Sequence, residues 1–213
     1  DREKLEKFHF KNYINFDLSI NNNNKLFLNP KTLNSIRTIN FIKKYKPDFI
    51  FIFGVDLISK KMLKYFKDKN LNLHLGLSPW YRGSATLFWP FYFLQPNYAG
   101  ATFHEINHKI DDGKIFHQTL PKLKKGQKIH DVAINCLIAC KKDLKFIIEN
   151  FIIKRKQIHK LMKNPRHSGK LFFVNSFKPQ HLQVIYSLFK NKIVDLYLNN
   201  KIKKNKPKII KQF

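Results

Sequence analysis

The chain has 213 residues and a mass of 25.5 kDa, which is room for one ordinary domain or for one domain with a short appendage. Apolar residues make up 43% of the sequence, so a continuous core can form and a wholly disordered chain is excluded. The net charge of +27 indicates either an anionic partner or a general bias toward Lys, and the scarcity of Arg favours the bias.

The sequence shows no sign of a membrane span or of secretion. Its apolar stretches are shorter than the roughly 20 residues that a membrane span needs, and the first residues, Asp1 to Lys7, are too charged for a secretory signal. Cys136 and Cys140 lie one turn apart in a helical pattern, which suits reduced thiols better than a disulfide framework. We therefore expect a cytoplasmic protein that does not bind membranes.

The first part of the sequence predicts helices and strands in alternation. In chain order these are a helix that ends at Lys46-Pro47, a strand over residues 48–54, a helix over residues 59–69 and a strand over residues 71–74. Thr32 or Asn34 is expected to cap the first helix. The strand over 48–54 is apolar almost throughout, which is typical of a strand that helices cover on both faces.

The remainder continues this alternation and then becomes irregular. It predicts strands over residues 101–106 and 114–119, a helix over 130–151, a linker over 164–170, a strand over 171–174, a helix from Pro179 and a strand over 193–198. The lysine-rich residues 201–211 are expected to form a solvated terminus. The alternation predicts an α/β fold, with a doubly wound, mostly parallel sheet flanked by helices over residues 1–163 and a small appendage over residues 164–213.

One segment, residues 72–83, combines polar side chains with a position at the end of a predicted strand. Asn72 and His74 are separated by one residue, so their side chains share a face of the strand. Ligands of open α/β sheets bind at the carboxyl ends of the strands. An amide beside an imidazole can polarise a carbonyl group and handle a proton, and Asp111, on the predicted turn 111–113, is a candidate carboxylate to hold the imidazole. A purely structural role for these polar residues is also open at this point.

The same segment resembles the signature of the folate-dependent formyltransferases. Members of that family typically carry an Asn-x-His segment followed by a Leu-Asp-x-Gly turn, and here the matching residues are Asn72, His74, Ser78-Pro79, Tyr81-Arg82-Gly83 and Ile110-Asp111-Asp112-Gly113. The resemblance covers residues 47–149. Leu75 and Gly76 depart from it, since Pro and Ser are usual there. No obvious first strand precedes Asn29, so we expect the N-terminal strand of the family to be missing or degenerate.

This resemblance implies roles for individual residues. Asn72, His74 and Asp111 match the catalytic Asn, His and Asp of the family, which act on the formyl group of 10-formyltetrahydrofolate and on the attacking amine. The family's folate slot implies that the cofactor-binding residues are Val55, Asp56, Leu57, Ile58 and Asp112, although Val55 and Leu57 are equally plausible as plain core. The implied substrate-binding residues are Tyr81, Arg82 and Gly83. No metal is expected, and His104 and His108 are interpreted as two surface histidines.

Several acceptors fit the resemblance. The lack of a Gly-rich phosphate loop disfavours glycinamide ribonucleotide, and the short stretch after Lys163 disfavours the carboxyl-terminal barrel of a methionyl-tRNA enzyme. We therefore expect formyl transfer from 10-formyltetrahydrofolate to a primary amine on a small phosphorylated molecule, such as a nucleotide-linked amino sugar, with Arg82 near its phosphates. Transfer to charged tRNA and deformylation with water as the acceptor are the alternatives, and a homodimer is a further expectation.

A function of another class is a basic nucleic-acid-binding module that keeps the fold without the reaction. Its candidate stacking residues are Phe51, Trp80, Trp89 and Tyr92, although aromatic residues in apolar runs more often belong to a core. The polar trio discriminates between the two classes, because a binding module has no need of Asn72, His74 and Asp111 together.

Overall fold

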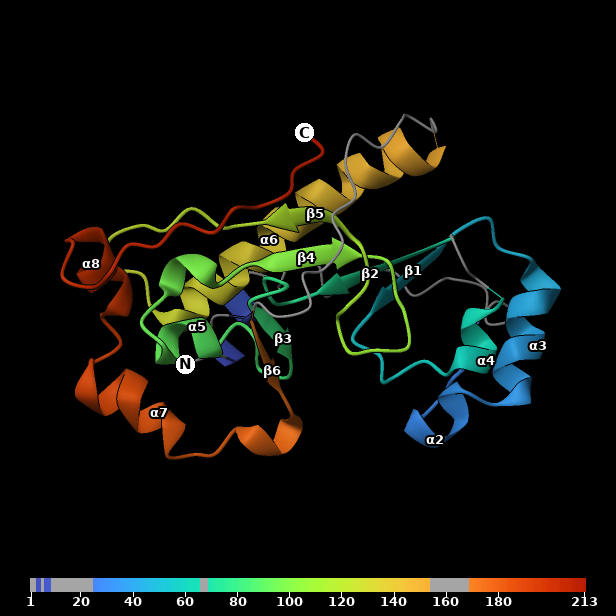
Figure 1. Ribbon diagram of the computed structural model, residues 1–213, viewed down its shortest axis with the longest axis horizontal. Coiled ribbons are helices and arrows are strands. Elements are labelled where there is room, and N and C mark those ends of the chain that lie inside the picture. The colour runs from blue at the N-terminus through green and yellow to red at the C-terminus, as the bar shows by residue number, and fades with distance from the viewer. Residues whose placement is uncertain (1–2, 5, 9–24, 66–68, 154–168) are drawn as a thin grey trace.

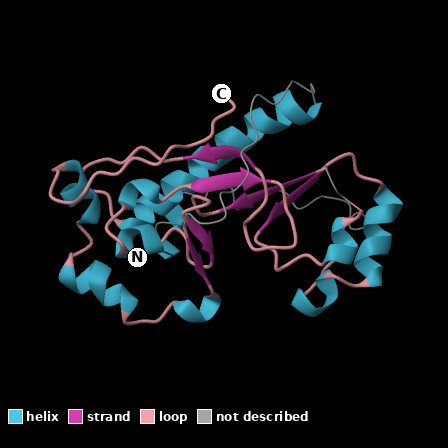
Figure 2. Cartoon of the chain, in the orientation of Figure 1, coloured by secondary structure: helices cyan, strands magenta, loops and turns pink. Residues whose placement is uncertain are grey.

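The computed structural model describes residues 3–4, 6–8, 25–65, 69–153 and 169–213. Within these residues the centre is a four-stranded sheet of order β1-β2-β4-β5, formed by Ile50–Phe53, Asn70–His74, Ala101–His104 and Ile115–Thr119. Helices pack around this sheet (Figure 1 and Figure 2), so the α/β class expected from the sequence is confirmed.

The strands of this sheet run in both directions. β1 and β2 are parallel, whereas β4 is antiparallel to both β2 and β5. A loop without a helix, residues 105–114, joins β4 to β5, and a direct return of this kind makes neighbouring strands antiparallel. The described sheet is therefore mixed, a detail that the apolar runs could not predict because they carry no information on pairing.

Side chains alternate along β2, and the two faces serve different purposes. Leu71 and Leu73 belong to a core cluster that includes Cys136 and Cys140 of the long helix α6, Ile129–Ile147. Asn72 and His74 point to the other face. One strand thus contributes both to the core and to a polar site.

Three short helices pack near β1: α2 (Pro30–Leu33), α3 (Ile36–Tyr45) and α4 (Lys60–Leu63). Asn29 caps α2 and Ser35 caps α3, so the expected cap at Thr32 or Asn34 is wrong, because the predicted single helix is divided in two. A cluster that includes Ile39, Ile52 and Met62 joins these helices to the strand.

Coverage of β1 is one-sided among the described residues. Ile52 is buried, but Phe51 and Phe53, which point the other way, are 38% and 49% exposed. The expectation that helices cover both faces of this strand is therefore wrong for the part of the chain that the structure describes. The reason is that α6 lies over β2, β4 and β5 and does not reach β1.

The part of the chain after residue 169 packs on the same body. A second sheet pairs β3 (Tyr81–Gly83) with β6 (Lys170–Phe172) in parallel. The remaining elements are α5 (Trp89–Tyr92), η2 (Pro96–Tyr98), η3 (Ile148–Ile153), η4 (Val174–Ser176), α7 (His181–Gln183), η5 (Val184–Leu188) and α8 (Ile193–Leu198). Ile185 and Val194 share a core cluster with Phe91 and Val132. The division into two parts at residue 163 stays a prediction, and most of the expected linker, residues 164–168, lies outside the described residues.

Two predictions for the C-terminal end are wrong. Residues 193–198 form the helix α8 instead of a strand, because Ile193, Val194 and Tyr197 are buried at helical spacing. The expected solvated terminus carries exposed lysines, but Ile210 is buried, and its carbonyl oxygen accepts a hydrogen bond of 2.8 Å from the Gln118 N–H of β5. Within the described ranges, none of the helices combines the length and the apolar character that crossing a bilayer requires.

Candidate active site

The structure brings the three residues predicted to be catalytic together beside β2. Asn72 and His74 are 9% and 7% exposed, and Asp111 lies in the loop between β4 and β5. The His74 Nδ1 atom is 3.3 Å from Asp111 Oδ2. Asn72 reaches the same carboxylate through a fourth residue, His104.

His104 is the site residue that the sequence analysis missed. Its Nε2 atom lies 3.0 Å from Asn72 Nδ2 and 3.5 Å from Asp111 Oδ1. It is 1% exposed, so its interpretation as a surface histidine is wrong. The antiparallel pairing of β2 with β4 sets His104 directly beside Asn72, and a pairing partner cannot be derived from local spacing.

The hydrogen bonds of His104 fix the orientation of the Asn72 amide. His104 Nδ1 lies 2.7 Å from the carbonyl oxygen of Glu105, which can only accept, so Nδ1 carries a hydrogen. The Nε2 atom lies within hydrogen-bond distance of the Asn72 amide nitrogen and close to Asp111, so this ring holds the amide beside the carboxylate. The second N–H of Asn72 has no hydrogen-bond partner among the described residues, and Asn72 lines a large cavity. The amide is thus held at the wall of that cavity.

The turn that carries Asp111 is fixed from several directions. Asp111 has a backbone φ of 46°, and its Oδ2 atom accepts a hydrogen bond of 2.8 Å from the Gly83 N–H. The next residue, Asp112, forms an ion pair of 2.8 Å with Arg82. A side chain at Gly113 would collide with the Glu105 carbonyl group, so glycine is needed there for close approach. These contacts hold the carboxylate against His74.

Both ring nitrogens of His74 face hydrogen-bond acceptors. Nδ1 faces Asp111, and Nε2 is 3.1 Å from the carbonyl oxygen of Tyr81. Burial lowers the pKa of His74 below its ordinary value, and the opposing effect of the Asp111 charge does not cancel this. The imidazole is therefore neutral at pH 7, yet its surroundings can stabilise a second ring proton when one arrives.

Asp111 is ionised under the same conditions. Burial by itself raises the pKa of this carboxyl group, but the side-chain contact with His104, the charge of His74 and the Gly83 N–H together lower it below its ordinary value. A neutral imidazole beside a carboxylate is an arrangement that can take a proton from a reacting group and keep it.

A cavity of about 890 Å³ opens beside these residues. Asn72, His74, His104 and Asp111 line it, together with the predicted cofactor wall of residues 55–58 and the predicted substrate residue Gly83. Much of the remaining lining is apolar, from Leu87, Phe88, Ile134, Leu137, Phe173 and Phe177. This size and mixture are typical of a pocket for an organic ligand, for which volumes of about 300–1,000 Å³ are usual.

The other predicted contact residues lie outside that lining. Tyr81 is buried in an aromatic cluster, and its hydroxyl group donates to Gln95 at 2.6 Å. Arg82 and Asp112 are paired with each other. Their predicted roles in substrate and cofactor binding stay predictions, and the pairing of Arg82 with Asp112 supports the Asp111 turn.

A sequence model of the family described as formyl transferase matches residues 5–137. The chain belongs to the formyl transferase family. Among curated relatives, a bifunctional polymyxin resistance protein ArnA of Wigglesworthia glossinidia brevipalpis is 36% identical over 96 residues, which are 45% of this chain and 14% of that protein. A methionyl-tRNA formyltransferase of Clostridium acetobutylicum is 30% identical over 124 residues, which are 56% of this chain and 39% of that protein. This family member thus spans well under half the length of these two relatives.

Solved structures share the fold of this formyl transferase family member. The formyltransferase PseJ from Anoxybacillus kamchatkensis, in complex with UDP-4,6-dideoxy-4-formamido-L-AltNAc and tetrahydrofolate, has a TM-score of 0.56 at 20% identity, with 92% of this chain and 93% of that chain covered. An N-formyltransferase from Helicobacter canadensis, in complex with folinic acid and dTDP-3-aminofucose, has a TM-score of 0.50 at 27% identity, with 60% and 46% covered. The structural match with PseJ extends over nearly the whole of both chains.

Proposed function

We propose that this chain transfers the formyl group of 10-formyltetrahydrofolate to a primary amine on a small, nucleotide-linked amino sugar. The observation that carries the proposal is the arrangement of Asn72, His74 and Asp111 in one cavity, with a free amide donor and a neutral imidazole backed by a carboxylate. Membership of the formyl transferase family supports the reaction type.

The residues of the cavity suit the two demands of acyl transfer to an amine. The free N–H of Asn72 can donate to a carbonyl oxygen that gains negative charge, and a preorganised donor of this kind is typically worth about 3 kcal/mol of the barrier. His74 can accept the proton that the attacking amine must lose, because it is neutral and within hydrogen-bond reach of Asp111. Asp111 then stabilises the protonated ring and holds it in place.

The cavity also fits the donor that the proposal requires. 10-Formyltetrahydrofolate supplies the formyl group when bound. Residues 55–58 contribute Val55, Leu57 and Ile58 to one wall of the cavity, and the family resemblance implies that backbone N–H and C=O groups of this stretch pair with the ring of the donor. A flat heteroaromatic ring needs both kinds of contact, and the site opens directly onto Asn72 and His74.

The choice of acceptor rests on the solved neighbours. The two described above were solved with a UDP-linked and a dTDP-linked sugar, and one of them is matched over nearly its whole length. Transfer to charged tRNA is the second candidate, since a methionyl-tRNA formyltransferase is 30% identical over its matched part. The two candidates share the catalytic residues and differ only in the acceptor.

The decisive experiment mixes the protein with 10-formyltetrahydrofolate and a panel of acceptors while free tetrahydrofolate is measured. We expect release with aminosugar nucleotides, little with charged tRNA and almost none without an amine. Asn72→Ala and His74→Ala should each lower the rate by at least ~100-fold. Lys124→Ala, on an exposed loop, is the matched control and should leave the rate unchanged.

Each other outcome has a definite meaning. Release with charged tRNA alone would replace the sugar by the second candidate, and equal release without any amine would identify a deformylase. Unchanged turnover in folded Asn72→Ala or His74→Ala protein would refute the mechanism. Circular dichroism of each variant establishes that the fold is intact.

A further inference from the structure

The mechanism gives no role to Gly76, which lies two residues after His74 and stands where Ser is usual in the family. A Cβ atom at this position would collide with the His74 Nε2 atom and with the Cβ and Oγ1 atoms of Thr86. Carbon atoms in contact are normally about 3.5–4.0 Å apart, so no side chain fits there. Gly76 is therefore needed for space, because His74 and Thr86 already occupy the place of its side chain.

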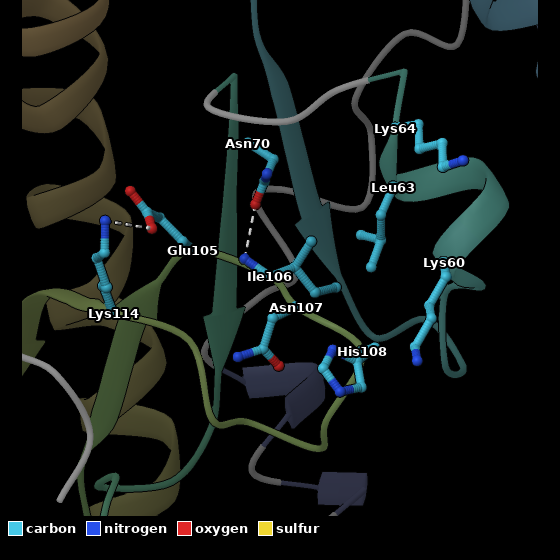
Figure 3. A pocket seen from close by; sticks show the side chains of 9 residues that line it. All are labelled: Lys60, Leu63, Lys64, Asn70, Glu105, Ile106, Asn107, His108 and Lys114. Atoms are coloured by element: carbon cyan, nitrogen blue, oxygen red, sulfur yellow. Dashed lines mark hydrogen bonds and ion pairs between the residues drawn. The ribbon is translucent and has the colours of Figure 1, made fainter.

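The strand that carries His74 is held at its start and along both edges. Asn70 Oδ1 accepts a hydrogen bond of 2.7 Å from the Ile106 N–H, beside a smaller cavity of about 370 Å³ (Figure 3). β1 and β4 pair with β2 on its two edges. His74 is the last residue of β2, so the position of its ring depends on the groups that follow the strand.

Thr86 is tied to the backbone beside Gly76. It is 4% exposed, and its hydroxyl group donates a hydrogen bond of 2.5 Å to the Leu75 carbonyl oxygen. The preceding residue, Ala85, has a φ of 54°, a backbone conformation that is uncommon for residues other than glycine. Unfavourable backbone geometry of this kind is often retained at functional sites. Thr86 and His74 also line the same large cavity, so this threonine belongs to the surroundings of the site.

The imidazole of His74 has acceptors at both ring nitrogens while it occupies the space beside Gly76. Nδ1 is 3.3 Å from Asp111 Oδ2, and Nε2 is 3.1 Å from the Tyr81 carbonyl oxygen. When the ring takes up a second proton, each of its two N–H groups then has an acceptor. A side chain at position 76 would strike Nε2 itself, so a ring displaced in this way would lose the contact with Tyr81.

We propose that Gly76 and Thr86 are positioning residues that hold the His74 imidazole between Asp111 and the Tyr81 carbonyl group. This inference rests on the proposed function, in which His74 takes a proton from the attacking amine. Gly76 acts by leaving room for the ring, and Thr86 acts by filling the rest of that space and by fixing the backbone that follows His74. Serine cannot replace Gly76 while Thr86 is in place, which accounts for this departure from the family.

Steady-state kinetics with varied 10-formyltetrahydrofolate and an aminosugar nucleotide test this inference. Gly76→Ala should lower kcat about 100-fold with little change in KM for the donor, because displacement of a reacting group by about 1 Å costs on that order. Thr86→Val keeps the shape of the side chain without its hydroxyl group and should lower kcat about 5- to 20-fold, the effect of one lost hydrogen bond and a loosened backbone. Thr86→Ser keeps the hydroxyl group and should recover most of that loss.

Two variants match these changes elsewhere in the molecule. Gly100→Ala also forces a Cβ atom against its neighbours, Leu120 and the Thr119 carbonyl group, but Gly100 lies outside the lining of the large cavity. Thr38→Val removes a buried hydroxyl group that donates to the Thr32 carbonyl oxygen at 2.9 Å, also away from that cavity. Both variants should keep kcat near that of the wild type.

The position of the ring can also be followed without turnover. NMR signals of the His74 ring nitrogens should shift in Gly76→Ala and stay unchanged in Gly100→Ala, and unmoved signals in folded Gly76→Ala protein would contradict the inference. Circular dichroism establishes that each variant is folded. If Gly76→Ala does not fold, the comparison of Thr86→Val with Thr86→Ser decides.

The outcomes separate the two proposals. If the wild type transfers no formyl group to any amine, the proposed function fails and the positioning role with it. If the wild type is active and Thr86→Val keeps its kcat, or Thr86→Ser is impaired as much as Thr86→Val, the positioning role is refuted and the proposed function stands. The same holds if Gly100→Ala and Thr38→Val lose as much activity, because the losses then come from general destabilisation.

Discussion

The imidazole of His104 contacts both the Asn72 amide and the Asp111 carboxylate, so in the proposed reaction it is a positioning residue. Its Nε2 atom is 3.0 Å from Asn72 Nδ2 and 3.5 Å from Asp111 Oδ1, and its side chain is only 1% exposed. Without it the Asn72 amide loses the contact that holds it beside Asp111, and it can rotate. A displacement of about 1 Å at such a site costs on the order of 100-fold in rate.

We therefore expect His104→Ala to lower kcat for formyl transfer roughly 10- to 100-fold, with little change in KM for the donor. His104→Gln should recover part of the loss, because its amide oxygen can accept from Asn72. Steady-state kinetics of both variants provide the measurement. If the two are equally impaired and equally destabilised in thermal melts, His104 has only a structural role.

The ionisation of His74 gives a second prediction at this scale. Burial lowers its pKa below 6.5, so the neutral ring that the mechanism needs persists to lower pH than in an exposed histidine. The acid limb of kcat/KM should therefore have its midpoint below 6.5. Because the Asp111 charge raises the pKa of His74, Asp111→Asn should move it further down. Titration of the ring by NMR checks the sign, and an upward shift in Asp111→Asn would contradict this account.

Among the elements, those with a strong local pattern were predicted and those defined by pairing were not. The apolar runs located β1, β2, β4 and β5, and the long periodic stretch located α6. Residues 193–198 were mistaken for a strand, because a mostly apolar run this short fits either a strand or a helix, and packing against α6 decides between them.

The same distinction between local pattern and strand pairing applies to the residues of the candidate site. Asn72 and His74 could be placed on one face because they share a strand, and Asp111 was a candidate from its predicted turn, which the family resemblance supported. His104 could not be assigned to the site from the sequence, because its position there depends on the register between β2 and β4.

Gln118 is one of the residues that attach the C-terminal segment to β5, beside Gln212, which contacts Phe116 and His117. The Gln118 side chain is fully buried, donates to the Ser78 carbonyl oxygen at 2.5 Å and accepts from the Ile210 N–H at 3.0 Å. Gln118→Leu keeps the volume but leaves both of these groups without a partner. Buried unsatisfied groups cost about 1–3 kcal/mol each, so we expect the free energy of unfolding to fall by roughly 2–4 kcal/mol.

Urea denaturation measures that change. Gln127→Leu, a substitution on the nearby loop where the glutamine is only partly buried, should have a smaller effect and serves as the control. A loss below about 0.5 kcal/mol in Gln118→Leu, the range of ordinary surface substitutions, would show that the segment is held by its apolar contacts instead.

At the scale of the whole molecule, the net charge of +27 opposes folding, because the compact state brings like charges together. The ion pairs of the described residues that could offset it, such as Lys145 with Glu149, lie largely at the surface and contribute little. Salt screens exposed charges beyond a Debye length of about 10 Å at 0.1 M, which is shorter than most distances between lysines on a molecule of this size.

Raising NaCl from about 20 mM to about 300 mM should therefore raise the melting temperature by roughly 2–8 °C, which corresponds to about 1–2 kcal/mol in a chain of this length. A variant with Gln at Lys122, Lys124, Lys125, Lys201 and Lys203, all exposed, should melt higher at low salt and respond less to NaCl. Differential scanning fluorimetry of both proteins across the salt series provides the comparison. A melting temperature that falls with salt in the wild type would mean that attractive pairs outweigh the repulsion, and the lysines would then belong to a stabilising network instead of a self-repelling surface.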